Sequence, residues 1–169
     1  MSRKVLILDT SVLCCWLKVP GKEAAGPSTD RWDHARIEQL LDDERQQGST
    51  FVLPIATLIE TGNHIAQAPE YRYERALALA GHLRDTSDAT SPWAAFTEQS
   101  TLWAPANLRL LAENWPRLAA AGTSIGDATI RDVAEYYAGA GFTVEILTGD
   151  QGLKAHEPAT PALIPRRRR

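Results

Sequence analysis

The sequence contains only two cysteines, Cys14 and Cys15, and they are neighbours in the chain. Adjacent cysteines are poorly placed to form a structural disulfide with each other, and alone they cannot supply the ligands of a tetrahedral metal site. We therefore expect both thiols to be reduced. Reduced thiols are typical of cytoplasmic proteins, so the sequence predicts a cytoplasmic location.

Long hydrophobic runs are missing as well. A charged residue or a proline interrupts every apolar stretch well before the ~18 residues expected of a membrane-spanning helix. After the opening Met1–Lys4, a short apolar run ends at Asp9, which is too short for the apolar region of a secretory signal. We expect neither a membrane span nor a secretory signal, and no membrane partner.

Positive charge is not in excess. The chain has 18 Lys and Arg against 21 Asp and Glu, a net charge of −3. Without Arg166–Arg169, 14 basic residues face 21 acidic ones, a net charge of −7. This balance disfavours tight, sequence-independent binding of nucleic acid over a broad basic face. A small basic groove beside an acidic pocket remains compatible with it.

Several sequence motifs of phosphate chemistry are absent. There is no glycine-rich phosphate loop with a lysine, and no Gly-x-Gly-x-x-Gly follows Leu8, so nucleotide cofactors lack support. A phosphoaspartate receiver domain needs an acidic pair near the end of its first strand, whereas Asp9 is followed by Thr10 and Ser11. A haloacid-dehalogenase-type phosphatase needs a second Asp at position 11, which is Ser11.

The composition fits one globular domain. The chain has 169 residues, of which 44% are hydrophobic and 23% charged. Val5–Leu8 and Phe142–Leu147 are short apolar runs of the kind that form strands buried on both faces. Helical patterns alternate with the strands, which predicts an α/β fold: a three-layer α/β/α sandwich with a central parallel sheet and Val5–Leu8 in its middle. We assign residues 1–155 to this domain and 156–169 to a Pro- and Arg-rich tail.

The helical patterns also predict which faces are buried. We expect Thr10 or Ser11 to cap a first helix, and Thr50–Leu53 to form another strand. Further helices are expected over Trp32–Gln47, from Pro54 onward, over Tyr71–Arg84, over Leu108–Leu118 and over Gly126–Ala138. The helix over Tyr71–Arg84 is predicted from the spacing of Tyr73, Leu77, Ala80 and Leu83. In the other helices the predicted core-facing positions are Leu58, Ile59, Ile65 and Ala66; Leu108, Leu111, Trp115 and Leu118; and Ile130, Val133, Ala134 and Tyr137.

Four acidic residues are expected to converge at one edge of the sheet. Asp9 and Asp150 follow the two apolar strands, and parallel strands end at the same edge. Glu60 lies about one and a half turns into the helix that begins after Pro54, near that edge. Asp127 stands in the first turn of its helix. The sequence therefore predicts a cluster of carboxylates from four separate segments.

Each acid also has a purely structural interpretation. Asp9 and Asp150 are placed to cap helices or turns, Asp127 suits the positive end of a helix dipole, and Glu60 suits a solvated helix face. Taken singly, these interpretations are the better ones. Taken together they are weaker, because Glu60 follows the apolar pair Leu58–Ile59 and Asp9 follows four apolar residues, where an unpaired charge is costly.

Carboxylates that share a pocket repel one another and raise their pKa values unless a cation neutralises them. Mg²⁺ and Mn²⁺ are hard ions that take oxygen ligands, so one or two such ions suit this donor set. Metal-assisted hydrolysis of a phosphodiester bond is the chemistry that follows.

At these residues the chain resembles the PIN-domain nucleases, over roughly residues 4–155. The resemblance rests on four motifs: Val5–Ser11, Pro54–Glu60, Ser124–Ala128 and Leu147–Leu153. It implies that Asp9, Glu60, Asp127 and Asp150 are catalytic metal ligands for one or two Mg²⁺ or Mn²⁺ ions, with Ser11 and Thr148 as supporting hydroxyls. Asn63 and His64 share a helical face with Glu60 and are candidates to contact a phosphate or a water, or to serve the surface or core.

The resemblance also implies a function. The expected activity is an endoribonuclease that cuts single-stranded or structured RNA, as the toxin of a toxin–antitoxin pair, with RNA and an antitoxin protein as partners and a homodimer as a further association. Two alternatives stay open: a catalytically silent PIN-like adaptor that binds RNA or protein, and a PIN nuclease that acts on DNA.

Two further features have two interpretations each. Trp93, Phe96 and Trp103 are able to stack on unpaired bases, although packing in the core or in a lid is the simpler expectation. Arg166–Arg169 suits a phosphate backbone or an acidic partner, and equally a solvated tail.

Overall fold

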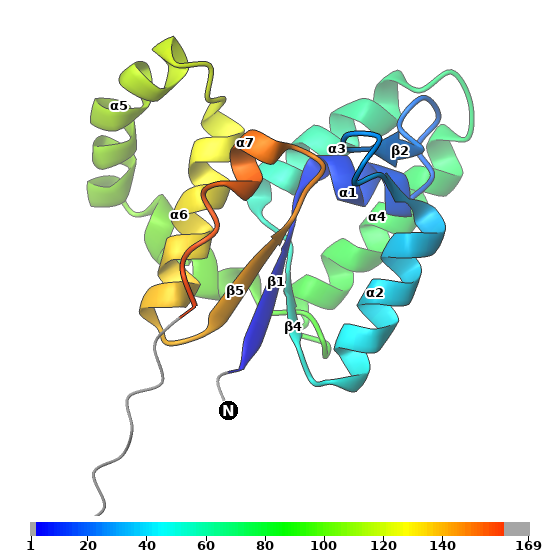
Figure 1. The fold of residues 1–169 in the computed structure, drawn as a ribbon, viewed down its shortest axis with the longest axis horizontal. Coiled ribbons are helices and arrows are strands. Elements are labelled where there is room, and N and C mark those ends of the chain that lie inside the picture. The colour runs from blue at the N-terminus through cyan, green and yellow to red at the C-terminus, as the bar shows by residue number, and fades with distance from the viewer. Residues whose placement is uncertain (1–2, 161–169) are drawn as a thin grey trace, which may run out of the picture.

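The computed structural model describes residues 3–160 and shows an α/β fold built on a parallel sheet (Figure 1). Its strands are β1 (Lys4–Leu8), β4 (Thr50–Val52) and β5 (Thr143–Leu147), in the order β4–β1–β5. Ile7 of β1 pairs with Val52 on one side and Ile146 on the other. The predicted central position of Val5–Leu8 and the parallel sheet are therefore confirmed.

Helices and a small hairpin connect these strands. The remaining elements in the described residues are α1 (Thr10–Trp16), the hairpin strands β2 (Ala24–Ala25) and β3 (Trp32–Asp33), α2 (His34–Gln46), α3 (Ile55–Gln67), α4 (Arg72–Ser87), the 3-10 helix η1 (Phe96–Trp103), α5 (Pro105–Ala120), α6 (Ile125–Gly139) and α7 (Gln151–Lys154). The Arg166–Arg169 run lies outside the described residues. Within residues 3–160, no helix is both long and apolar enough to cross a membrane.

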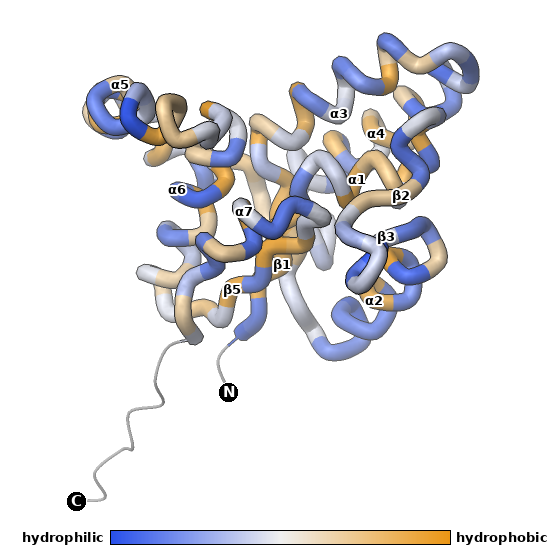
Figure 2. Tube along the Cα trace, turned by 45° about the horizontal axis from the view of Figure 1, so that its top comes forward, coloured by the Kyte–Doolittle hydropathy of each residue, from blue (hydrophilic) through white to orange (hydrophobic). Residues whose placement is uncertain are grey.

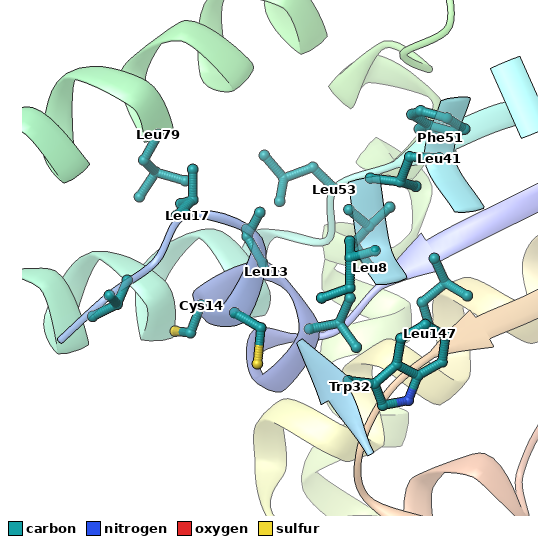
Figure 3. Packing of buried hydrophobic residues seen from close by; sticks show 14 of the residues in the cluster. Leu8, Leu13, Cys14, Leu17, Trp32, Leu41, Phe51, Leu53, Leu79 and Leu147 are labelled. Atoms are coloured by element: carbon teal, nitrogen blue, oxygen red, sulfur yellow. The ribbon is translucent and has the colours of Figure 1, made fainter. Parts of the chain in front are cut away.

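Helices cover both faces of the sheet. Leu6 and Leu8 point into a cluster that also contains Leu13 of α1 and Leu41 of α2 (Figure 3). The alternate residues Val5 and Ile7 pack on the opposite face against α6. Successive strand residues point to opposite faces, so both faces of β1 are apolar from Val5 to Leu8, and Lys4 at its start is charged. Figure 2 shows the hydrophobic colour along this strand beyond its hydrophilic N-terminal end. This arrangement is compatible with the predicted three-layer sandwich.

The helix α6 agrees best with the prediction made from hydrophobic periodicity. Its predicted positions Ile130, Val133, Ala134 and Tyr137 are all buried against the sheet. The Ser124 hydroxyl caps the helix by accepting a hydrogen bond from the Asp127 N–H at 3.0 Å. The predicted helix over Gly126–Ala138 is confirmed to within a residue at each end.

The helix predicted over Tyr71–Arg84 is present as α4, but the predicted core-facing role of α5 is wrong. In α4, Tyr73 is 77% exposed and Leu77 53% exposed. No residue of α5 is buried, and Leu108, which was expected to face the core, is 40% exposed. The three-stranded sheet offers two faces, and other helices already cover them. The helix α4 therefore packs on α3, and α5 packs on α6 and η1, outside the central layers (Figure 1).

Smaller corrections concern helix faces and ends. Ile59 is 56% exposed and Ala66 is exposed, because α3 turns Thr57, Thr61 and Ile65 inward instead. The expected helix from Trp32 begins two residues later, since Trp32–Asp33 pairs with β2 in the hairpin.

Both outer edges of the sheet are occupied. On β4, the Phe51 N–H donates to the Pro92 carbonyl at 2.8 Å, and the Phe51 carbonyl accepts from the Ala94 N–H at 2.9 Å. On β5, the Ile146 N–H donates to the Glu157 carboxylate at 2.8 Å. The Ile146 carbonyl accepts from the Lys154 ammonium at 3.1 Å.

Candidate functional site: a carboxylate cluster at the strand ends

Asp9 lies at the junction of β1 and α1 and is only 6% exposed. Its Oδ2 accepts three hydrogen bonds: from the Ser11 N–H at 3.3 Å, the Ser11 hydroxyl at 2.7 Å and the Thr148 hydroxyl at 2.8 Å. Asp9 is therefore the cap of α1, and the expected cap at Thr10 or Ser11 is wrong. The reason is that the strand ends at Leu8 and the helix begins with no intervening linker.

The hydroxyls of Ser11 and Thr148 join the ends of β1 and β5. The Ser11 Oγ accepts from the Gly149 N–H at 2.9 Å, and the Thr148 Oγ1 accepts from the Asp150 N–H at 2.9 Å. Each hydroxyl thus donates to Asp9 and accepts from the backbone of the β5–α7 turn. Both residues hold the site together, as expected of supporting hydroxyls.

Glu60 comes from α3 and is held between two other segments. The Thr10 hydroxyl donates to Glu60 Oε2 at 3.0 Å. The other oxygen, Oε1, lies against the backbone of Gly126, where a Cβ atom would overlap it. Thr57 fixes α3 to the end of β1, since its hydroxyl donates to the Leu8 carbonyl at 2.8 Å.

Asp127 lies in the first turn of α6 and is half-buried. Burial raises the pKa of Asp127 above its ordinary value. A hydrogen bond with Ser124 opposes this shift, whereas the negative charges of Asp9, Asp150 and Glu60 add to it. All four predicted acids are therefore close enough to interact.

Asp150 is placed differently from the other three acids. Its side chain is exposed and caps α7, with Oδ1 accepting from the Gly152 N–H at 2.7 Å and the Leu153 N–H at 3.3 Å. Beside it, a Cβ atom at Gly149 would lie 2.6 Å from the Gly26 nitrogen, so the hairpin packs directly on this turn. Asp150 stands at the rim of the cluster.

Other predicted candidates make no hydrogen bond with the four acids within residues 3–160. The Asn63 side chain is exposed and makes no hydrogen bond within residues 3–160. Trp93 is buried, with its ring centroid 5.7 Å from that of Phe51 in an edge-on contact, so it is a core residue. Phe96 packs against the hydrophobic core cluster that contains Phe51 and Trp93. Trp103 is 37% exposed.

Sequence reasoning missed Thr10 and Gly126. Thr10 stands between two residues that were recognised, Asp9 and Ser11, and its position beside a candidate ligand was the available signal. Gly126 precedes Asp127 directly, and a glycine inside a helix is unfavourable unless close packing requires it. The Gly126–Glu60 contact gives that packing reason.

Within the described residues, no three His, Cys, Asp or Glu side chains are gathered tightly enough to hold a metal ion as they stand. The donor chemistry fits Mg²⁺ or Mn²⁺, because every candidate ligand is a carboxylate oxygen. In addition, all donors to Asp9 bind Oδ2, and none within residues 3–160 reaches Oδ1.

Comparisons with protein-family models, curated proteins and solved structures found no match to this chain. The resemblance of the four motifs to the PIN-domain nucleases therefore stays a prediction.

Proposed function

We propose that this protein is a Mg²⁺- or Mn²⁺-dependent endoribonuclease of the PIN type. The observation that supports this best is the convergence of four acids from four segments. Asp9 follows β1, Glu60 lies on α3, Asp127 opens α6 and Asp150 caps α7, and the charges of Asp9, Glu60 and Asp150 all act on Asp127. Carboxylates that lie close together repel one another and destabilise the folded protein unless a bound cation neutralises them.

Asp9, Glu60 and Asp127 would hold the metal, with Asp150 contributing from the rim. Bound there, Mg²⁺ or Mn²⁺ supplies Lewis acidity and lowers the pKa of a coordinated water, which is the chemistry that phosphodiester hydrolysis needs.

The surrounding residues orient the carboxylates. Ser11 and Thr148 bind Asp9 Oδ2, so Oδ1 is kept for a ligand. Thr10 binds Glu60 Oε2 while Gly126 makes room for Oε1. Fixed carboxylate oxygens lose little freedom when a cation binds, which favours a preorganised site.

A catalytically silent adaptor is the second candidate. The observation that favours it is the lack of a tightly gathered group of three acids in residues 3–160. An adaptor of this fold would bind RNA or protein without hydrolysis, and its acids would act as the caps described above.

The discriminating experiment incubates the purified protein with labelled single-stranded RNA and with DNA of the same sequence, in Mg²⁺, Mn²⁺ or EDTA. We expect metal-dependent cleavage of RNA that Asp127→Asn abolishes. Asp88→Asn is the matched control, since Asp88 is exposed and ends α4 far from the cluster in sequence. Binding of RNA without cleavage in any metal would favour the adaptor. Preferential cleavage of DNA would identify DNA, and not RNA, as the substrate.

The biological role implied by the resemblance is a toxin restrained by an antitoxin. Expression of the protein alone should then arrest cell growth, and Asp127→Asn should not. Equal growth with both proteins would remove the toxin role while leaving the nuclease proposal to the cleavage assay.

A further inference from the structure

A cleft of about 580 Å³ lies between α5 and α6. Its volume is within the range of small-molecule sites and suits one nucleotide. The residues that matter for its chemistry are Asn114, Arg117, Arg131, Asp132 and Tyr136.

The cleft and the carboxylate cluster share the helix α6. Ala128, which lines the cleft, follows Asp127 directly in α6. Arg131, also in its lining, is one helical turn beyond Asp127, about 6 Å along the axis. A chain whose phosphate reached Asp127 would therefore have its neighbouring nucleotide at the mouth of the cleft.

Groups in the cleft are available to a ligand. Within residues 3–160, the Arg117 guanidinium has no ion-pair or hydrogen-bond partner, and neither does the Asn114 side chain. Both belong to α5, where they lie three residues apart and so share a helical face. The Tyr136 side chain is 36% exposed, which leaves ring surface for stacking.

The lining carries both signs of charge, which favours a nucleotide over a charged peptide. Arg131 is partly neutralised by Glu135, whose carboxylate lies 3.4 Å away, so among the described residues of the lining Arg117 is the cation without an ion pair. The Asp132 carboxylate offers an acceptor. A nucleotide matches this mixture, because its phosphate is an anion while its base edge presents N–H donors and a face for stacking.

We propose that the α5–α6 cleft binds one nucleotide of single-stranded RNA next to the phosphodiester that the carboxylate cluster cuts. Arg117 binds a phosphate, Tyr136 stacks on the base, and Asn114 and Asp132 face the base edge. This inference rests on the proposed nuclease function, since it assigns the substrate path of that site.

The test measures binding of a fluorescently labelled single-stranded pentaribonucleotide by anisotropy, in EDTA, so that no cleavage occurs. Arg117→Gln is compared with Arg109→Gln, which changes the same residue type on the same helix but outside the cleft. We expect Arg117→Gln to weaken binding about tenfold and to reduce the salt slope by about 0.7. Arg109→Gln should bind as the wild type does.

A second variant, Asn114→Asp, replaces the amide at the expected base edge with a carboxylate on the same helical face as Arg117, and should weaken binding similarly. Circular dichroism and melting check that the variants fold; both residues are exposed, so folding is expected to persist.

If Arg117→Gln and Asn114→Asp bind RNA as tightly as the wild type, the nucleotide assignment is overturned and the cleft is left to a protein partner. The two proposals fail separately. Loss of RNA affinity in Arg117→Gln without any metal-dependent cleavage would support the cleft and reject the nuclease. If Arg117→Gln cleaves RNA and binds RNA as the wild type does, the nuclease proposal is supported and the cleft proposal is rejected.

Discussion

The Oε1 oxygen of Glu60 occupies the space that a side chain at Gly126 would fill. Gly126→Ala should therefore push the Glu60 carboxylate away from its position beside Asp127. The helix itself should gain about 0.5–1 kcal/mol, because Ala is a better helix former than Gly. We expect cleavage to fall at least tenfold while the melting temperature is unchanged or higher.

Gly139→Ala is the matched control for this substitution. Gly139 belongs to the same helix, and a Cβ atom there meets nothing within 4 Å. It should leave cleavage unchanged. Equal activity of the two variants would show that the position of Glu60 does not matter.

Asp9→Asn and Asp127→Asn should both abolish cleavage but differ in stability. Asp9 accepts two hydroxyl hydrogen bonds, so loss of its charge weakens them by about 1 kcal/mol in total. Asp127 is destabilised by burial and by the other acids, so its replacement should leave the melting temperature no lower. Thermal denaturation in EDTA measures the melting temperatures of both variants. A lower melting temperature for Asp127→Asn than for Asp9→Asn would contradict the described contacts.

Divalent metal should stabilise the folded protein. At a concentration 100 times the Kd, binding contributes about 2.7 kcal/mol, which is roughly 5–10 °C for a domain of this size. We expect Mn²⁺ to raise the melting temperature of the wild type and EDTA to reverse the effect. Asp127→Asn should show a much smaller rise, and an equal rise in both proteins would place the ion elsewhere.

His82 should make stability depend on pH. It is stacked on Trp16, with ring centroids 4.5 Å apart, and lies 5.2 Å from Trp93. Burial lowers the pKa of His82 below 6.5, while the charges of Asp85 and Glu38 oppose the shift. His82 has a lower pKa in the folded protein than in the unfolded chain. At a pH between these two pKa values the unfolded chain binds more protons, so the free energy of unfolding should fall as pH drops below about 6.5.

Urea denaturation at pH 5 and pH 7 measures this dependence. His82→Phe keeps an aromatic ring in the stack and should reduce the difference between the two pH values. His156→Gln changes an exposed histidine and should not. An unaltered difference in His82→Phe would mean that other groups cause it.

The parts of the fold that the sequence predicts are those whose burial is complete. Val5–Leu8 is apolar at every position because helices cover both faces, and α6 is recognised because its inward stripe meets the sheet. The apolar stripe of α5 is equally regular, yet Leu108 is exposed and no residue of the helix is buried. Periodicity reports that a face is apolar but not what covers it, and here the sheet has no face left for α5.

The site was predictable to a similar degree. Strand ends position Asp9 and Asp150, so the rule for parallel sheets finds them. The contacts of Glu60 with Thr10 and Gly126 join segments about 50 or more residues apart. Such pairs depend on how α3 meets α1 and α6, which no local sequence pattern records.

The occupied edges of the sheet restrict how this protein meets a partner. An open edge strand is a template on which an extended peptide adds a further strand. Here the outward backbone groups of Phe51 are paired with residues 92–94, and those of Ile146 with the side chains of Lys154 and Glu157. Growth of the sheet by β-augmentation is thereby blocked at its centre on both sides. Recognition of another chain is left to side chains on the outer helices, where Tyr73 and Leu110 are exposed.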